Sequence, residues 1–478
     1  MRLETGFRLK SFTRPLQKFY LTGDPLKTHS ADINMTEGPI AKQIVVFAIP
    51  LFLGNLFQQL YNTADTFAVG NLLGDDALAG VSSSGSLIFL LVGFFSGIAM
   101  GAGVVIARCF GAGDVVNMRK AIHTSIVAFF IAGVVFSVAG AFGAETMLVL
   151  MRTPKEVLPQ ATEYVRTYFA GLVTMVMYNV CMGIMQAVGD SRHPLYYLIF
   201  SSLLNIALDY LFIGAFKMGV GAAAAATVIS QFLSVCLCMA RLLRVKTDYR
   251  VSIKELKIDR HMLVMILKYG LPSGFQNSVI SIANVVVQSH INLFGPEAMA
   301  GCGAYAKIEG FAFLPVTCFS AALTTFVGQN LGASKPERAK KGTRFGIITA
   351  VLLAEAIGGL ILLSAPFLID AFTESSEALR FGVDKARICC GFFFLCALCH
   401  CLAAVLRGAG KAVVPMTAML VCWCVIRVTI LFITVPLLGM IDIVNWVYPI
   451  TWSLCASALI IYYFAADWAK PRPAGEAL

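Results

Sequence analysis

The chain contains one motif twice, as Asn71-Leu-Leu-Gly-Asp-Asp-Ala-Leu-Ala-Gly80 and as Asn292-Leu-Phe-Gly-Pro-Glu-Ala-Met-Ala-Gly301. The two copies share six of ten residues and lie 221 positions apart. The same offset pairs further residues: Gly111-Ala112 with Gly332-Ala333, Lys120 with Lys341, Gly189 with Gly410, and Pro194 with Pro415. A 478-residue chain that repeats itself in this way is predicted to be an internal duplication.

The composition indicates that both copies lie in a membrane. Hydrophobic residues make up 58% of the chain and charged residues only 13%, whereas a soluble protein has roughly 25% charged residues. A membrane-spanning helix needs about 20 apolar residues. Apolar runs predict twelve spans, at residues 40–69, 78–107, 121–143, 158–188, 194–215, 219–240, 262–292, 298–328, 343–370, 387–406, 412–437 and 442–467. We therefore expect an all-α polytopic membrane protein and not a water-soluble enzyme.

Six spans, an even number, separate the two copies, so both halves have the same orientation in the membrane. Parallel repeats of this kind are typical of transporters whose substrate site lies between two lobes, and a duplicated channel or receptor scaffold is the alternative. The expected organisation has four parts. They are residues 1–34 as a cytoplasmic tail or a start placed too far upstream of Met35, 35–245 as the N-lobe, 246–261 as a cytoplasmic linker, and 262–478 as the C-lobe.

The distribution of basic residues predicts the orientation. Seven basic residues precede or begin the first span, and seven more lie between Arg241 and Arg260. The opposite segments hold few cations, chiefly Arg152, Lys155, Lys217, Arg380, Lys385 and Arg387. By the positive-inside rule, we expect both termini to lie on the cytoplasmic side of the cell (inner) membrane. The net charge of +10 is then explained by loops and lipid headgroups, and we expect no nucleic-acid partner.

Two carboxylates inside the predicted spans of the first half are candidates for ion coupling. Asp65 follows Gln58 and Asn62 at helical spacing, with Tyr61 beside them, and Asp209 follows Asn205 by four residues. Acids within the bilayer are costly and therefore candidate functional groups. With amides nearby, such a pair is suited to load and release H+ or to hold Na+. The alternative is that both acids lie at the outer ends of their spans, in water.

The second half carries other intramembrane charges. Glu309 is expected to pair with Arg427, either as a structural salt bridge or in coupling, while Lys307 points elsewhere on its helix. Glu355 is predicted to be structural, reaching the outer interface. No nucleotide-binding or metal-hydrolase motif occurs in the sequence, so an ion gradient is the expected driving force, with no cofactor besides H+ or Na+.

These features together resemble the multidrug and toxic compound extrusion (MATE) family over residues 36–470. The matching motifs are Phe47-Ala-Ile-Pro50, Asp65-Thr-x-x-Val-Gly70, Gly111-Ala112, Gln186-Ala-Val-Gly189-Asp190, Asn205-x-x-x-Asp209, Gln329-Asn-Leu-Gly-Ala333 and Leu406-Arg-Gly-Ala-Gly410. Each motif alone is weak, but their order, spacing and repetition are specific.

The resemblance implies two six-helix lobes in a V-shaped arrangement, alternating access, and export of amphipathic, often cationic drugs or metabolites in exchange for H+ or Na+. It assigns coupling to Asp65, Asn205 and Asp209, and a bending point in the first helix to Pro50. It places Gln58 and Asn179 on the N-lobe cavity, to which we add Tyr61, Asn62 and Gln186 as polar neighbours.

The sequence departs from the family pattern in the second half. Some members carry a C-lobe glutamate and aspartate where this chain has Gln276-Asn-Ser-Val-Ile280 and Cys396-Ala-Leu-Cys399. This difference argues against coupling through a C-lobe carboxylate. The N-lobe cavity is therefore the expected site, with Met175, Met177 and Met185 as adaptable walls.

A lipid-linked saccharide flippase of related architecture is the rival function. A flippase of this kind is expected to have a central cavity lined by cationic side chains. Arg427 and Lys307 would then both have to project into that cavity. We expect a monomer, because the duplication already supplies both lobes.

Overall fold

The computed structural model describes residues 33–73, 75–151, 153–373 and 375–470; of residues 62, 64–73, 75–84 and 86 it describes the backbone alone. Within these ranges the first half forms six helical rods. They are α2 (Ile40–Leu73), α3 (Asp75–Ala112), α4 (Val115–Leu150), α5 (Leu158–Ala170) with α6 (Leu172–Ala187), α7 (Arg192–Asp209) with the π-helix η1 (Tyr210–Ala215), and α8 (Gly221–Arg244).

The second half repeats this order. After the short 3-10 helix η2 (Ile253–Glu255), its rods are α9 (Arg260–Asn292), α10 (Pro296–Ala312) with α11 (Leu314–Gly332), α12 (Pro336–Asp370), α13 (Ser376–Cys389) with η3 (Cys390–Phe392) and α14 (Phe393–Gly408), α15 (Val413–Met419) with the π-helix η4 (Leu420–Ile426) and α16 (Arg427–Leu438), and α17 (Ile441–Ala465). Each of the twelve predicted spans overlaps one rod, and the all-α, two-lobe prediction is confirmed.

Most rods are apolar enough to cross a membrane. Among the described residues ten helical spans pass a length and hydropathy test, and α5 with α6, bent by 47°, makes an eleventh. The remaining rod is α9, whose middle carries Gln276, Asn277 and Ser278. A membrane helix tolerates such polar residues where they face other helices or a cavity instead of lipid.

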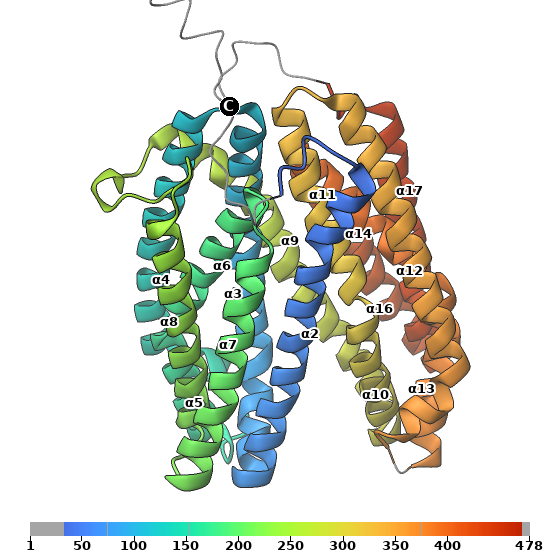
Figure 1. The fold of residues 1–478 in the computed structure, drawn as a ribbon. Helices are drawn as coiled ribbons and strands as arrows, with labels where there is room; N and C mark the ends of the chain where they lie inside the picture. The colour runs from blue at the N-terminus through green and yellow to red at the C-terminus, as the bar shows by residue number, and fades with distance from the viewer. Residues whose placement is uncertain (1–32, 74, 152, 374, 471–478) are drawn as a thin grey trace, which may run out of the picture.

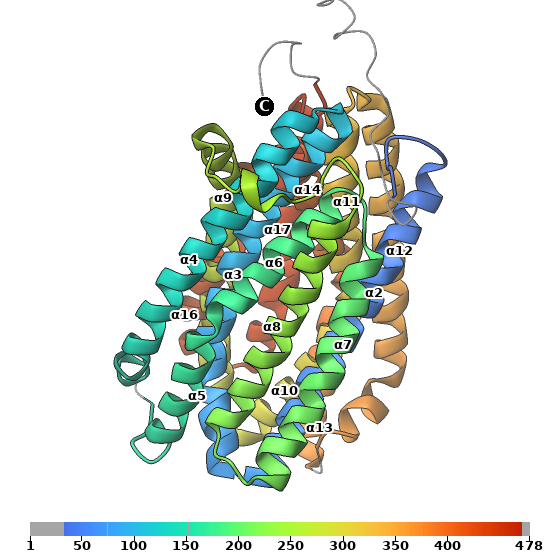
Figure 2. The same ribbon diagram turned by 60° about the vertical axis from the view of Figure 1, so that its left-hand side comes forward.

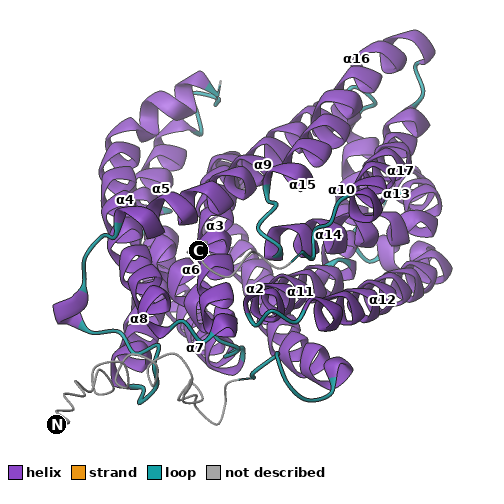
Figure 3. Ribbon diagram, turned by 90° about the horizontal axis from the view of Figure 1, so that it is seen from above, coloured by secondary structure: helices purple, strands orange, loops and turns teal. Residues whose placement is uncertain are grey.

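The two lobes lie side by side and diverge toward one end (Figures 1 and 3). The other end, at the top of Figure 1, carries the starts of α2 and α9 and the loop between α8 and α9. We call it the basic end, because the basic segment from Arg241 to Arg260 lies there. The expected linker is held against α4 at this end, where Ser252 N donates to His123 Nε2 (3.0 Å) and Asp259 N donates to Thr124 Oγ1 (2.9 Å).

The first helix of each half crosses to the opposite lobe near the basic end. Phe47 and Leu51 of α2 belong to the hydrophobic core of the second half. Ile266 and Tyr269 of α9 belong to the core of the first half. Farther along, α2 runs beside α7 (Figures 1 and 2). The repeat boundary in the sequence is therefore not the boundary between the two packed cores.

The first and second halves make a close backbone contact where α3 crosses α9. Gly97 and Gly101 of α3 face Gly270 and Gly274 of α9, and a Cβ atom on Gly270 would lie 2.7 Å from the Ile98 carbonyl oxygen. A Cβ on Gly274 would lie 2.8 Å from the Phe94 carbonyl oxygen. Paired small residues four positions apart let membrane helices pack backbone against backbone. We call this contact the glycine seam.

The glycine seam predicts a strong effect of a single methyl group. Gly101→Ala would overlap the Gly270 backbone, and overpacking of this kind typically costs about 1–3 kcal/mol. We expect a lower melting temperature of the purified protein in detergent. The matched control is Gly359→Ala in α12, where an added Cβ has no atom within 4 Å. Equal melting temperatures of the two variants would show that the seam is not tightly packed.

Candidate functional site

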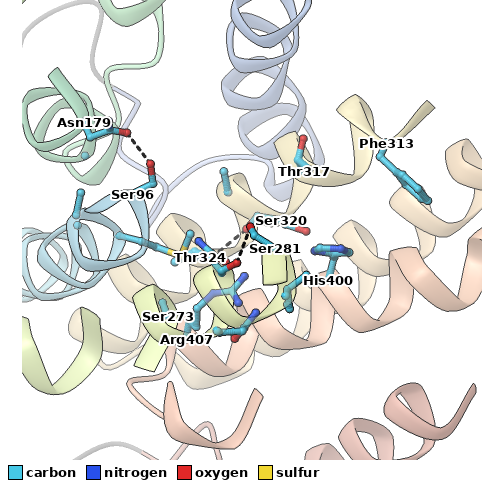
Figure 4. A pocket seen from close by; sticks show the side chains of 18 of the residues that line it. Ser96, Asn179, Ser273, Ser281, Phe313, Thr317, Ser320, Thr324, His400 and Arg407 are labelled. Atoms are coloured by element: carbon cyan, nitrogen blue, oxygen red, sulfur yellow. Dashed lines mark hydrogen bonds between the residues drawn. The ribbon is translucent and has the colours of Figure 1, made fainter. Parts of the chain in front are cut away.

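A cavity of about 620 Å³ lies between the lobes (Figure 4). Its walls come from α3 and α6 of the first half and from α9, α10, α11, α14, η4, α16 and α17 of the second. A cavity of this volume suits a drug-sized molecule. Among the residues expected to form the site, Asn179 and Gln186 line it.

The cavity lining follows the internal repeat. Three polar residues of the first half have lining partners 221 positions later: Ser96 with Thr317, Asn179 with His400, and Gln186 with Arg407. The helices that carry them, α3 with α6 and α11 with α14, are equivalent in the two halves. His400 and Arg407 were not among the predicted site residues, although the repeat offset applied to Asn179 and Gln186 identifies both.

The N-lobe wall is built around Asn179. Ser96 Oγ donates to Asn179 Oδ1 (3.0 Å; Figure 4), and Asn179 Nδ2 donates to the Met175 carbonyl oxygen (2.9 Å). Met100 and Met182 line the cavity. The expected methionine walls were wrong: Met175, Met177 and Met185 are buried in the N-lobe core, because they fall on the inner faces of α6.

The expected coupling residues of α7 are buried in the N-lobe. Asp209 is 1% exposed, so the alternative of an acid solvated at the outer end does not apply to it. Asn205, one turn away, donates from Nδ2 to Thr227 Oγ1 of α8 (3.3 Å). Its Oδ1 is buried with no hydrogen-bond partner among the described residues. The pair therefore places two buried polar side chains one turn apart on α7, with Asn205 in contact with α8.

The other expected N-lobe residues lie on α2. Pro50 is inside this continuous helix, Gln58 is exposed, and Tyr61 is half-buried. Neither Gln58 nor Tyr61 is among the described residues that line the cavity. The side chains of Asn62 and Asp65 lie outside the described residues.

The described residues show no metal-binding group of three His, Cys, Asp or Glu side chains. An ion held at Asp209 would draw its other ligands from neutral groups such as Asn205, or from side chains that are not described.

Arg427 lies on the cavity, and among the described residues no carboxylate is within salt-bridge distance of it. Its Nη2 and Nε donate to Thr451 Oγ1 (2.9 and 3.3 Å), and its guanidinium lies 4.5 Å from the Tyr448 ring centroid. Glu309 also lines the cavity and accepts from the Tyr305 hydroxyl (3.3 Å). Glu309 and Arg427 do not form the expected salt bridge, because no N–O distance between them is within 4.0 Å.

Lys385 was expected among the outer loop cations, and the structure corrects this. It is 4% exposed within α13, with its Nζ 5.5 Å from the Tyr305 ring centroid and 5.2 Å from that of Tyr448. Its spacing from Gly382 and Cys389, both buried, places it on the inner face of the helix. This periodicity was the sequence signal for its position.

Two further charges lie away from the cavity. Lys307 is exposed, with its Nζ 5.4 Å from the Phe372 ring centroid. Glu355 is half-buried in α12.

Buried hydrogen bonds join the lobes at the basic end. Gln329 Nε2 donates to the carbonyl oxygen of the cavity residue Ala187 (2.8 Å), and Gln329 Oε1 accepts from Met35 N (3.0 Å). The Met35 carbonyl oxygen accepts from Asn330 Nδ2 (3.1 Å) and Arg338 Nε (3.2 Å). An opening of the cavity at the basic end would have to break these contacts.

Comparison with known proteins agrees with the duplicated, two-lobed fold. A sequence model of the MatE family matches twice, at residues 50–211 and 272–433, and the matches begin at Pro50 and Pro272. The chain belongs to the MatE family. The resemblance drawn from its motifs is confirmed, and the chain is a multi-pass membrane transporter of the MATE type.

Relatives and solved structures match over nearly the full length. The chain is 28% identical to the probable multidrug resistance protein YoeA of Bacillus subtilis, covering 90% of this chain and 95% of the relative. It is 26% identical to the probable multidrug resistance protein NorM of Thermotoga maritima, covering 90% and 94%. A solved multidrug resistance MATE transporter of the MOP superfamily, in an outward-facing conformation, superposes with a TM-score of 0.84 at 25% identity, covering 92% and 97%.

The bridge at Gln329 predicts a local change in backbone protection. Gln329→Leu removes both side-chain bonds and leaves the Met35 amide and Ala187 carbonyl without these partners, which costs about 1–3 kcal/mol for each buried group. We expect faster hydrogen exchange in the peptide that contains Met35. The control is Gln288→Leu, because the side chain of Gln288 is exposed and donates to Asn292 of its own helix. Unchanged exchange in Gln329→Leu would contradict a stabilising role.

Proposed function

We propose that this MATE transporter is a multidrug exporter that expels amphipathic small molecules in exchange for H+ or Na+. The observation that carries the proposal is the central cavity between the lobes, together with the buried Asn205–Asp209 pair of the N-lobe. Its relatives YoeA and NorM are named as probable multidrug resistance proteins. The proposed role is transport, with no catalysis and no cofactor other than the coupling ion.

Coupling rests on the cost of a buried carboxylate. An ionised Asp209 in the low-dielectric N-lobe is destabilised unless a cation neutralises it. A proton or Na+ supplies that charge, and Asn205 Oδ1, buried and unbonded among the described residues, is an oxygen ligand one turn away. We assign the same function to Asp65 of α2. Pro50, which cannot donate a backbone hydrogen bond within α2, is the proposed bending point.

We propose that the basic end lies on the cytoplasmic side of the cell membrane. The segment from Arg241 to Arg260 lies at this end, as the positive-inside rule requires of a cytoplasmic loop. Contacts of Gln329 and Met35 hold the lobes together there. In this state the cavity is shut off from the cytoplasm, and export requires a second state in which these contacts are broken. We expect a single chain to carry out the cycle as a monomer.

The flippase alternative is less well supported. It requires both Arg427 and Lys307 on the central cavity. Arg427 does line the cavity, but Lys307 is exposed near Phe372 on the outer part of α10. One of the two expected cationic contacts is therefore missing.

Coupling through the N-lobe is tested in proteoliposomes. We expect efflux of a fluorescent substrate under a separate H+ or Na+ gradient to fall at least about tenfold in Asp65→Asn and in Asp209→Asn, because each variant removes the group that the ion neutralises. The gradient that drives wild-type efflux identifies the ion. The control is Asp370→Asn, an exposed acid at the end of α12. Full exchange in both N-lobe variants would overturn the assignment.

A further inference from the structure

We propose that the C-lobe side of the central cavity is an anion-binding subsite, in which Arg407 and Arg427 hold a carboxylate or phosphate group of the transported compound. The inference rests on the proposed function, because it assumes that the compound passes through this cavity. It adds a substrate class: amphipathic organic anions with an apolar, preferably aromatic, body.

Both arginines are buried and both line the same cavity. Arg407 is 7% exposed and Arg427 is 2% exposed. Arg407 lies in the last turn of α14 near the basic end, whereas Arg427 lies midway along the rod that starts at Val413. At a rise of about 1.5 Å per residue, Arg427 is roughly 20 Å from that end. The cavity therefore offers a guanidinium at two depths.

Arg427 is held by neutral groups. The Thr451 hydroxyl accepts from its Nε and Nη2, and the rings of Tyr448 and Trp423 lie 4.5 and 5.6 Å from the guanidinium carbon. No ion pair within 4.0 Å involves Arg427 in the described part of the chain. These contacts fix the orientation of the guanidinium without neutralising it.

Arg407 has still fewer partners. Its Nε is buried with no hydrogen-bond partner among the residues that the structure describes, and it takes part in none of the ion pairs found there. The equivalent residue of the N-lobe is the neutral Gln186. The two equivalent positions both line the cavity, and the positive charge is present at the C-lobe position but not at the N-lobe position.

The charges on the described cavity wall do not balance. Its charged side chains are Glu309, Arg407 and Arg427. Glu309 interacts electrostatically with Lys385, which is buried behind the wall, and also with Arg427. The three cations Lys385, Arg407 and Arg427 therefore outnumber this one carboxylate by two charges. An uncompensated cation inside a membrane protein is costly, and a bound anion would relieve that cost.

The chemistry of the wall indicates which anion fits. A guanidinium binds carboxylate or phosphate through two parallel hydrogen bonds. Thr325 adds a hydroxyl group, and Phe313, Trp423 and Trp452 add aromatic surface for an apolar body. Export of such an anion from a cell that is negative inside is also favoured by the membrane potential.

The subsite is tested by binding to the purified full-length protein in an uncharged detergent. The probes share one naphthalene body: 2-naphthoate, 2-naphthyl phosphate, neutral 2-naphthamide and cationic 2-naphthylmethylammonium. Trp423 and Trp452 line the cavity, so quenching of tryptophan fluorescence reports binding. We expect the two anions to bind at least about tenfold more tightly than the amide and the ammonium compound, a difference of about 1.4 kcal/mol.

The variants assign this preference to the arginines. Arg407→Gln and Arg427→Gln are each expected to lower affinity for both anions about tenfold and to leave affinity for the amide unchanged. Arg407→Lys and Arg427→Lys keep the charge and should lose less affinity for the anions. They keep the test informative if a glutamine variant fails to fold. The control is exposed Arg387→Gln, whose partner Asp384 lies on its own helix.

A further arm adds phosphatidylglycerol to the detergent micelles. Arginine-dependent competition with 2-naphthoate would support the subsite and identify a lipid phosphate as an occupant, whereas absence of competition would support a free organic anion. Equal wild-type affinity for naphthoate and naphthamide, or a preference that survives in both glutamine variants, would overturn the inference. Transport without anion preference refutes only the subsite, whereas anion binding without ion-driven exchange refutes only the antiport proposal.

Discussion

The backbone contact between α3 and α9 is the constraint on which the rest of this structure depends. Gly97 and Gly101 meet Gly270 and Gly274 so closely that no side chain fits between them, and this approach joins one helix of each half. Ser96 and Ser273 directly precede two of these glycines and both line the cavity. The seam therefore fixes where the lobes touch and also brings their polar residues to the same space.

The duplication gives the two lobes equivalent helices, but the buried charged side chains on those helices differ in sign. The acid Asp209 is buried at the end of α7 in the N-lobe, whereas the equivalent rod of the C-lobe carries Arg427. Gln186 and Arg407 show the same divergence on the cavity wall. A duplicated fold can in this way bind two different ligands. In the proposed scheme the coupling cation neutralises the acid of the N-lobe, and the transported compound contacts the arginines of the C-lobe.

Much of this arrangement could be predicted from the sequence. Apolar runs located the twelve rods, and the repeat offset, applied to Asn179 and Gln186, identifies His400 and Arg407. Other expectations failed because they depended on how helices rotate. Met175, Met177 and Met185 face the core of the N-lobe, and Lys385 turns inward from a helix that begins eleven residues earlier than its predicted span, at Ser376. Hydropathy measures the average polarity of a segment and says nothing about which face meets a neighbour.

The sequence by itself determined the fold class, the duplication and the family, because span length, hydrophobicity and repeated spacing are properties of the chain read in order. The tertiary structure decided which charges are paired. Glu309 and Arg427 lie on rods that are both correctly predicted, yet Glu309 bonds Tyr305 while Arg427 bonds Thr451. An ion pair requires two atoms within about 4 Å, and that distance depends on how the two helices rotate and cross, which the order of residues along the chain does not specify.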